Sequence, residues 1–245
     1  MLLKKCTGRK SLTLLLAAVY MISYLTRINF GAVISEMVSS TGFSQSLLSL
    51  SLTGSFITYG IGQIISGVLG DLVSPKKLVT VGFITTAVMN FTIPFCPNPY
   101  YMIVIWCLNG FAQSLMWPPM VKIMTAHLSE EEYKKSVTKV SWGGSIGTIA
   151  VYLLAPLLIT LCGWRWVFFT SSVFGAAMLF IWIFLAPDEA RKERHFSKSR
   201  SSRSLQGFVF TADAGHYGGD HFSGNSPRRR YHVDALVPCA NLRPE

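Results

Sequence analysis

An arginine within an apolar stretch is the residue most suited to chemistry in this sequence. Arg27 lies about 22 Å along a helix axis beyond Leu12, at about 1.5 Å per residue, and apolar residues follow it. By spacings of four, three and four, its helical face is shared by Tyr20, Tyr24 and Gly31. A guanidinium offers phosphate or carboxylate oxygens a planar fork of donors and cannot lose its charge. The pattern predicts an anion site at membrane depth; the alternative is an arginine that snorkels to the outer headgroups.

A second group of charged residues follows an apolar stretch that carries a small residue at every fourth position. Asp71 ends this stretch, and a turn leads to Lys76 and Lys77. A carboxylate at a helix end can pair with a neighbouring helix terminus or base, and can be released when a bundle rocks. The small residues predict the close approach of another helix; they are Gly54, Thr58, Gly62, Ser66 and Gly70.

Two later apolar stretches also carry polar side chains. Pro118 and Pro119 remove helix hydrogen bonds and bend the first of these stretches, which is tolerated where protein or a cavity satisfies the backbone. In both stretches the polar residues could line a site or simply form hydrogen bonds between helices. They are Asn109, Gln113, Trp117 and Lys122 in one stretch, and Ser141, Ser145, Thr148 and Tyr152 in the other.

Membrane-spanning helices must position these residues. Half of the 245 residues are hydrophobic and the mean hydropathy is +0.40, which excludes ordinary soluble enzyme folds. The apolar stretches are long enough to cross a bilayer of about 30 Å, and they predict an all-α membrane protein with a six-helix bundle. The six predicted spans are about Leu12 to Ser35, Ser46 to Leu72, Leu78 to Cys96, Tyr100 to Ala126, Val137 to Cys162 and Trp164 to Ala186.

The basic residues predict the orientation of the bundle. If the spans alternate, nine lysines and arginines fall on one side, whereas the opposite connections offer only Arg165. The positive-inside rule then places both termini in the cytoplasm of a multi-pass protein of the cell (inner) membrane. The net charge of +10 is mainly this topology signal, and nucleic-acid binding is the weaker explanation. The nine residues are Lys4, Lys5, Arg9, Lys10, Lys76, Lys77, Lys134, Lys135 and Lys139.

The sequence divides into three parts. Residues 1–11 form a cytoplasmic N-terminus, residues 12–187 the transmembrane bundle, and residues 188–245 a basic tail that we expect to be cytoplasmic and disordered. The first span could instead be a signal peptide, but it is too long and has no small-residue cleavage pattern. RNA binding is an alternative role for the Ser/Arg tract in the tail. The five cysteines have no ligand-like spacing, so we expect no metal and no cofactor.

The chain resembles the organophosphate:phosphate antiporter family of the major facilitator superfamily, which comprises glycerol-3-phosphate and hexose-phosphate carriers. The resemblance runs from about Tyr20 to Pro187. It implies that Arg27 grips the substrate phosphate, that tyrosines line the pore, and that an aspartate loop gates the cytoplasmic side. The segments that carry it are Tyr24 to Phe30, Tyr59-Gly60, the loop from Gly67 through Asp71 to Lys76 and Lys77, and Gln113 with Trp117, Pro118, Pro119 and Lys122.

Several positions depart from the family pattern. The chain has Gln63 where glycerol-3-phosphate carriers have a lysine, and Gly144 where they have a histidine in the fifth span. Leu72 and Ser74 replace an arginine and a glycine that are frequent in the loop. With Arg27 as the one cationic partner from this half, a monoanion or a carboxylate becomes a credible substrate.

The resemblance also implies a partner. Carriers of this family have two six-span halves with the site between them, whereas this sequence contains one. We expect either an incomplete gene product, whose tail after about Arg194 replaced the second half, or a chain that pairs with another.

The expected function is antiport of organic phosphates or related organic anions by alternating access. Arg27, Tyr24, Tyr20, Tyr59, Gln63 and Trp117 are the expected substrate-binding residues. Alternatives are a carrier-like membrane sensor of sugar phosphates and a carrier of other solutes. An enzyme is the least favoured class, because no nucleophile and base, metal cluster or phosphate-binding glycine loop is evident.

Overall fold

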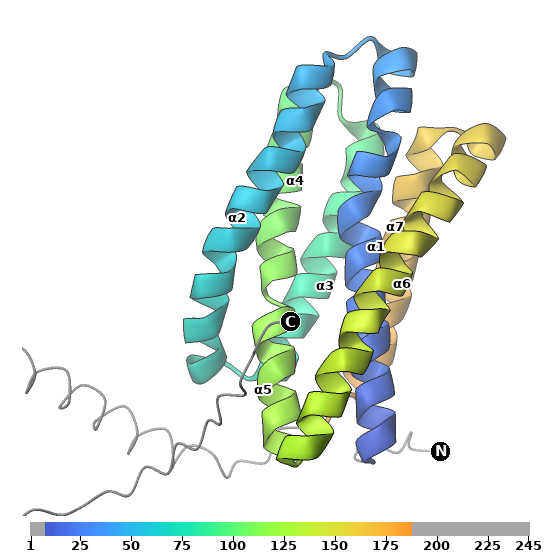
Figure 1. Cartoon of the computed structure of the whole chain (residues 1–245). Coiled ribbons are helices and arrows are strands. Elements are labelled where there is room, and N and C mark those ends of the chain that lie inside the picture. Colours follow the sequence, from blue (N-terminus) through green and yellow to red (C-terminus); the bar gives the residue numbers. More distant parts are fainter. Residues whose placement is uncertain (1–7, 188–245) are drawn as a thin grey trace, which may run out of the picture. The chain divides into compact units, whose positions relative to one another are not determined.

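A computed structural model describes residues 8–187, which are entirely helices and short connections (Figure 1). The predicted tail, 188–245, and most of the predicted cytoplasmic N-terminus lie outside the described residues. No strand occurs in the part that the structure describes. The helices are α1 (Arg9–Thr41), α2 (Gln45–Leu72), α3 (Pro75–Thr92), the 3-10 turn η1 (Ile93–Phe95), α4 (Pro99–Ser114), α5 (Trp117–His127), α6 (Glu130–Cys162) and α7 (Trp164–Leu185).

Five of these helices, α1, α2, α3, α6 and α7, are long and apolar enough to cross a membrane. The fourth predicted span is broken into α4 and α5, which follow each other in Figure 1. The break lies at Leu115 and Met116, and Pro118 and Pro119 stand in the first turn of α5. There a missing backbone N–H costs little, because the first turn of a helix has no partner for it. The predicted six-helix bundle is confirmed, with a broken fourth member.

Glycines let α6 lie against α1. A Cβ atom on Gly143 or Gly147 would collide with the backbone carbonyl oxygens of Ala17 and Met21 respectively. Without the hydrophobic drive that acts in water, such backbone proximity maximises van der Waals contact between helices. A hydrogen bond of 2.8 Å between the hydroxyls of Thr13 and Ser136 joins the same two helices nearer their N-termini.

The predicted stripe of small residues on α2 faces α4 over part of its length. Gly62 lies against Ser114, and Gly110 of α4 lies against Ser55 of α2. The Thr58 hydroxyl donates a hydrogen bond of 2.7 Å to the carbonyl of Cys107. Close packing therefore explains the middle of the stripe, whereas a Cβ added at Gly70 would have no neighbour within 4 Å.

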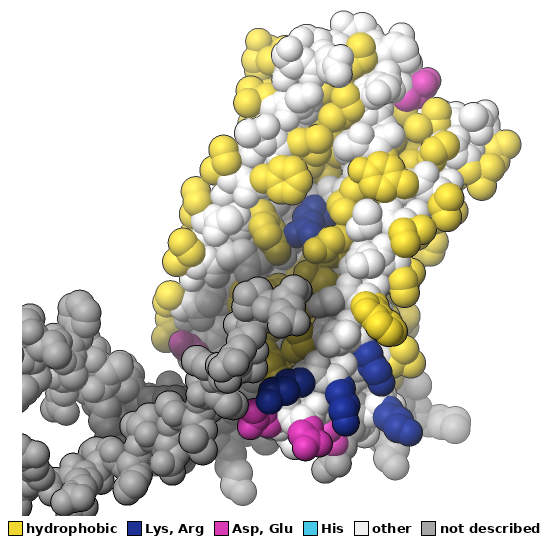
Figure 2. Space-filling model, in the orientation of Figure 1, with side chains coloured by type: hydrophobic (Ala, Val, Ile, Leu, Met, Phe, Trp, Pro, Cys, Tyr) yellow, Lys and Arg dark blue, Asp and Glu magenta, His cyan; other side chains and the backbone are white. Residues whose placement is uncertain are grey.

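The chain alternates between the two ends of the bundle. The start of α1, the α2–α3 turn and the α5–α6 connection lie at one end, and the α1–α2, η1–α4 and α6–α7 connections lie at the other (Figure 1). Dark-blue and magenta side chains gather at the end that holds the start of α1 (Figure 2). This arrangement agrees with the alternation assumed for the orientation, while the side of the membrane remains a prediction.

Cys162 provides a test of that orientation. It is exposed beside the α6–α7 turn, where Gly163 has a φ of 90°, whereas Cys96 is half-buried at the same end. Burial raises the pKa of the Cys96 thiol, which lowers its reactive thiolate fraction. In cells, a membrane-impermeant maleimide should label Cys162 rapidly and Cys96 slowly, and should reach Cys6 and Cys239 only after permeabilisation. Labelling of Cys6 before Cys162 would invert the proposed topology.

Candidate functional site

Arg27 lies between two tyrosine rings. Its Cζ is 4.3 Å from the ring centroid of Tyr24 on α1 and 4.6 Å from that of Tyr59 on α2. The side chain is half-buried near the middle of α1. Cation–π contact with two rings stabilises a guanidinium away from bulk water. Snorkelling to the end of the bundle is therefore not the conformation that the structure has.

The tyrosine contacts continue from Arg27 to α5. The hydroxyls of Tyr20 and Tyr24 are 3.3 Å apart, and their rings meet edge to face at 4.9 Å. Tyr20 also contacts the ring of Trp117 at 4.8 Å. The structure thus brings five of the six predicted binding residues into one continuous series of contacts across α1, α2 and α5. Their role in binding a substrate remains a prediction.

The edge of the Arg27 guanidinium has no partner among the residues that the structure describes. Within residues 8–187, neither an ion pair nor a hydrogen bond to this group is found; the two rings contact its faces. Removing such a cation from water is costly unless an anion accompanies it. The arrangement can accept an anion in the plane of the guanidinium, where its N–H groups point.

Two of the positions that depart from the family pattern adjoin this arrangement. Gln63 follows Tyr59 by one helical turn, and its amide nitrogen is buried without an acceptor among the described residues. Gly144 is buried on α6, where an added Cβ would lie 3.0 Å from the Tyr20 ring and 3.1 Å from the Tyr24 ring. The two phenols therefore occupy the space that a side chain at position 144 would need.

A buried network of hydrogen bonds joins α1 to α3 and α4. The carbonyl of Thr26 accepts hydrogen bonds from Asn90 at 3.0 Å and from Asn109 at 3.3 Å. Gln113 donates to the hydroxyls of Thr26 at 2.9 Å and of Thr86 at 3.3 Å. Asn109 and Gln113 of α4 therefore hold the residue before Arg27 and do not join the tyrosine series. For these two residues the structure shows the hydrogen bonds between helices that the sequence analysis gave as the alternative; the sequence did not identify Thr26 as the acceptor.

The polar face predicted for the fifth span is largely exposed. Ser141, Ser145 and Tyr152 of α6 are exposed, and the Thr148 hydroxyl donates to the carbonyl of Gly144 in its own helix at 3.0 Å. Within residues 8–187, none of these four side chains donates or accepts a hydrogen bond to another helix. The face is available to a solute pathway or a further chain.

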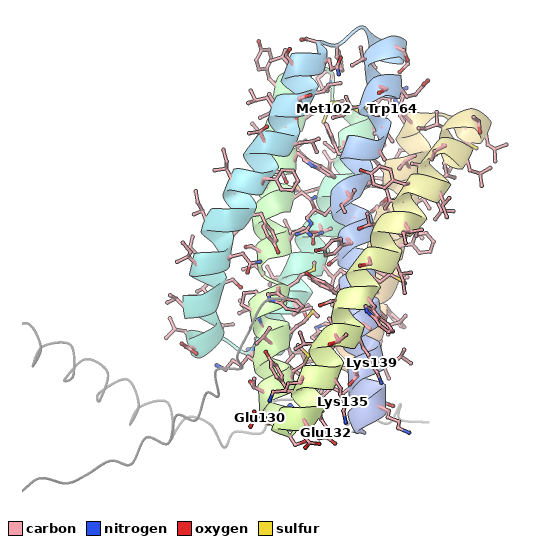
Figure 3. All side chains as sticks on the ribbon, in the orientation of Figure 1. Met102, Glu130, Glu132, Lys135, Lys139 and Trp164 are labelled. Carbon is pink, nitrogen blue, oxygen red and sulfur yellow. The ribbon has the colours of Figure 1, made fainter. Side chains whose placement is uncertain are left out.

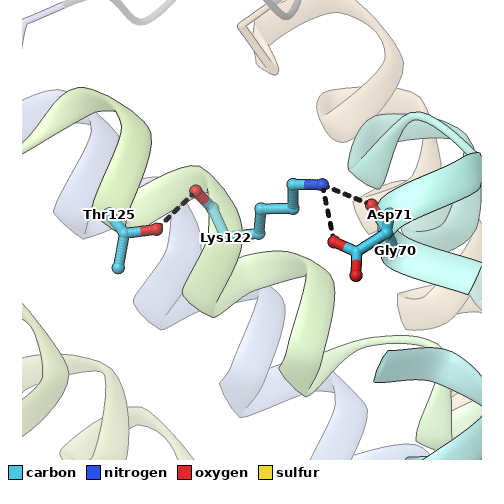
Figure 4. Close-up of polar contacts among 4 residues, drawn as sticks. All are labelled: Gly70, Asp71, Lys122 and Thr125. Atoms are coloured by element: carbon cyan, nitrogen blue, oxygen red, sulfur yellow. Dashed lines mark hydrogen bonds and ion pairs between the residues drawn. The ribbon is translucent and has the colours of Figure 1, made fainter. Parts of the chain in front are cut away.

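Asp71 is paired with Lys122 of α5 (Figure 4). The Lys122 ammonium lies 3.3 Å from the Asp71 carboxylate and donates a hydrogen bond of 2.6 Å to the carbonyl of Gly70. Lys122 thereby satisfies a carbonyl at the C-terminal end of α2, where a positive charge is also favoured by the helix dipole. The sequence had singled out both residues without pairing them.

The other predicted gating residues lie beside this pair along the chain. The Lys76 ammonium donates to the carbonyl of Ala186 at 3.1 Å, and the carbonyl of Lys76 accepts from Trp182 at 3.2 Å. These bonds join the start of α3 to the end of α7. Gly67 and Lys77 are exposed. Gating by Gly67, Asp71, Lys76 and Lys77 remains a prediction, to which the structure adds Lys122.

A double-mutant cycle can measure the Asp71–Lys122 pair. Because both side chains are partly exposed, with 72% and 32% of their surface accessible, we expect Asp71→Asn and Lys122→Gln to show a coupling of at most about 1 kcal/mol in the free energy of unfolding. Lys122→Gln alone should cost more than Asp71→Asn alone, since it also removes the bond to Gly70. Lys77→Gln is the control. Equal costs for the two single variants would contradict the bond to the helix end.

The chain is similar in sequence to known membrane proteins. The model of the Major Facilitator Superfamily matches residues 16–230. A probable hexose phosphate transport protein of Chlamydia trachomatis is 27% identical over 164 residues, which cover 67% of this chain and 36% of that protein. The membrane sensor protein UhpC of Escherichia coli is 30% identical over 113 residues, which cover 46% of this chain and 26% of that protein.

A solved structure shares the fold. The inward-open conformation of the xylose transporter XylE from E. coli superimposes with a TM-score of 0.65 at 12% identity, over 86% of this chain and 57% of that chain. At this identity the likeness concerns the fold alone.

The chain spans about a third or less of the two curated relatives, with 36% and 26% of their lengths matched.

Proposed function

The chain belongs to the Major Facilitator Superfamily, and we propose that it forms one half of a secondary carrier that exchanges organic phosphates or related organic anions. Hexose phosphate and glycerol-3-phosphate are the substrates that the family resemblance suggests, and the similarity to a hexose phosphate transport protein favours the former. The observation that carries the proposal is Arg27, held between two phenol rings and without a hydrogen bond or ion pair at the edge of its guanidinium among residues 8–187.

The guanidinium would act as the anchor of the substrate. A phosphate oxygen pair can accept two parallel N–H bonds in the guanidinium plane, while Tyr24 and Tyr59 cover its faces. Binding would then neutralise a cation in surroundings of low dielectric, which makes the bound anion both favourable and well oriented. No covalent step is part of this function.

Exchange requires that the site opens to each side in turn. In our proposal the second six-helix half closes over the face that carries Arg27, and the two halves rock about the bound anion. The Asp71–Lys122 pair at the end of α2 would form and break during this motion. Gradients of substrate, phosphate or proton would supply the driving force, with both termini cytoplasmic and the bundle in the inner membrane.

One cation from this half favours a singly charged ligand. Gln63 can donate a neutral hydrogen bond, and the tyrosine rings fill the space beside Gly144. A dianion would need further positive charge from the second half. A monoanionic phosphate ester or a carboxylate fits the described half by itself.

Calorimetric titration tests the proposal on the purified chain in lipid nanodiscs. At about pH 5, where a phosphate ester with a second pKa of about 6 carries mainly one negative charge, glucose 6-phosphate should bind and inorganic phosphate should compete with it, whereas glucose should produce no heat of binding. With a second half supplied, proteoliposomes loaded with phosphate should take up labelled sugar phosphate. Equal affinity for glucose and its phosphate ester would reject the anion site.

A membrane sensor is the second candidate function, because UhpC aligns with part of this chain. A sensor would bind sugar phosphate through the same arginine but would not exchange it. Binding without exchange in the proteoliposome assay, together with co-purification of a signalling partner, would favour the sensor. A carrier of uncharged solutes would bind glucose alone.

A further inference from the structure

The basic end of α1 and α6 contains positive side chains that the transport site does not use. Lys10 of α1 and Lys135 and Lys139 of α6 are exposed, and none has an ion pair with a described residue. Figure 2 shows dark-blue side chains close together at this end of the molecule. Because Thr13 and Ser136 are hydrogen-bonded at 2.8 Å, the two helices that carry the lysines lie in contact here.

The acidic residues near these lysines lie in the first turn of α6, closer to its N-terminal start than Lys135 and Lys139. Figure 3 shows Lys135 and Lys139 above Glu130 and Glu132 on α6. Glu130 is paired with Lys134 at 2.8 Å, and the Glu132 carboxylate accepts from the Ser129 backbone N–H and hydroxyl in a capping box. Glu131 is also exposed in this first turn. Carboxylates thus occupy the N-terminal start of α6, and the lysines without an ion pair among residues 8–187 lie further into the helix.

The lysines lie on an exposed side of α6. Trp142 follows Lys139 by three residues and Lys135 by seven, so all three share one helical face. Trp142 is 65% exposed, and the same face continues with the exposed apolar residues Ile146 and Leu153. This face is distinct from the one that carries Ser145, which lies about 60° to 120° around the helix from it at 100° per residue.

The order of side chains along this face matches the layers of a bilayer. Charged residues end at Lys139, Trp142 lies about one turn deeper, and the next residues on this face, Ile146, Ile149 and Leu153, are apolar. Tryptophan prefers the boundary between headgroups and acyl chains, and lysines there extend into the headgroup layer. A lipid phosphate is the anion that is present at this depth.

We propose that Lys10, Lys135, Lys139 and Trp142 form a binding surface for an anionic phospholipid, which we name the basic boundary patch. The lysines contact the headgroup phosphate, and the indole packs against the glycerol and upper acyl region. The patch is independent of Arg27, which lies deeper and on α1 between Tyr24 and Tyr59. Its occupant is phosphatidylglycerol or another lipid of the same charge.

Lipids with brominated chains quench nearby tryptophan and can test the patch. The full chain is placed in phosphatidylcholine nanodiscs with increasing brominated phosphatidylglycerol, and the signal of Trp142 is taken as the difference between wild type and Trp142→Phe. Half-quenching should need at least about fivefold less phosphatidylglycerol than brominated phosphatidylcholine, since a lysine at an anionic surface contributes about 1 kcal/mol, or about fivefold. The preference should weaken in high salt.

Matched variants separate charge from packing. Lys135→Gln with Lys139→Gln should bring the preference to within about twofold of none, while Lys135→Arg with Lys139→Arg should retain it. Lys134→Gln is the control, because Lys134 is already paired with Glu130. Loss of preference in the arginine variant, retention in the double glutamine variant, or absence of preference in wild type would each overturn the proposal.

Discussion

Replacing Arg27 by alanine is expected to weaken the binding of glucose 6-phosphate at least about a hundredfold. Two charge-assisted hydrogen bonds contribute about 1.5–3 kcal/mol each, and each 1.4 kcal/mol is a factor of about ten in affinity. Arg27→Lys keeps the charge but loses the planar fork, so we expect about a tenfold loss. Titration calorimetry of the three proteins in nanodiscs measures these differences.

Stability should change in the opposite sense. Arg27 has no acidic partner in the described part of the chain, and its side chain is half-buried. Alanine at this position removes the cost of holding an unpaired cation at membrane depth. We therefore expect Arg27→Ala to unfold at the same denaturant concentration as wild type or at a higher one.

Arg165→Ala is the matched control for Arg27→Ala. The Arg165 guanidinium also lies over an aromatic ring, 4.6 Å from the Trp164 centroid, and donates to the carbonyl of Pro94 at 3.3 Å. It stands at the start of α7, at the opposite end of the bundle from Lys10. Its removal should leave affinity unchanged and reduce stability slightly. A similar loss of affinity in both variants would show that Arg27 acts only through the fold.

Helical periodicity explains how much of the site could be predicted. Tyr20, Tyr24 and Arg27 belong to one helix, and their spacing alone places them on one face. Contacts between helices are different, because periodicity fixes which side of a helix a residue occupies and not which helix lies opposite. Tyr59 could be added only through the family resemblance. The pairing of Asp71 with Lys122, 51 residues apart, had no local signal.

The helix ends show a similar limit. The predicted first span ends at Ser35 and the fifth begins at Val137, whereas α1 continues to Thr41 and α6 already begins at Glu130. Hydropathy reports where the bilayer ends, and a helix can extend beyond that point with polar residues. The start of α6 does have a local signal, since Ser129 and Glu132 form a capping box. The helix breaks at Leu115 and Met116 and not at Pro118, because the first turn of α5 tolerates a proline without a backbone N–H.

Glycine replacements on α6 should separate the effects of backbone and side-chain neighbours. An added Cβ at position 144 would meet the rings of Tyr20 and Tyr24, which can rotate. Gly144→Ala should therefore change anion affinity through the displaced rings and leave unfolding nearly unchanged. This difference is checked by measuring both quantities on the same preparation.

Gly147→Leu is expected to have the largest effect on stability. Its Cβ would meet the backbone carbonyl of Met21, which can yield only if α1 moves away from α6. Forcing extra atoms into such a contact costs about 1–3 kcal/mol or more, against about 1 kcal/mol gained in helix propensity. Gly67→Leu on α2 is the matched control, because nothing lies within 4 Å of a Cβ there. Denaturant midpoints should move in opposite directions for the two variants, and equal midpoints would mean that α1 and α6 are not in close contact in the membrane.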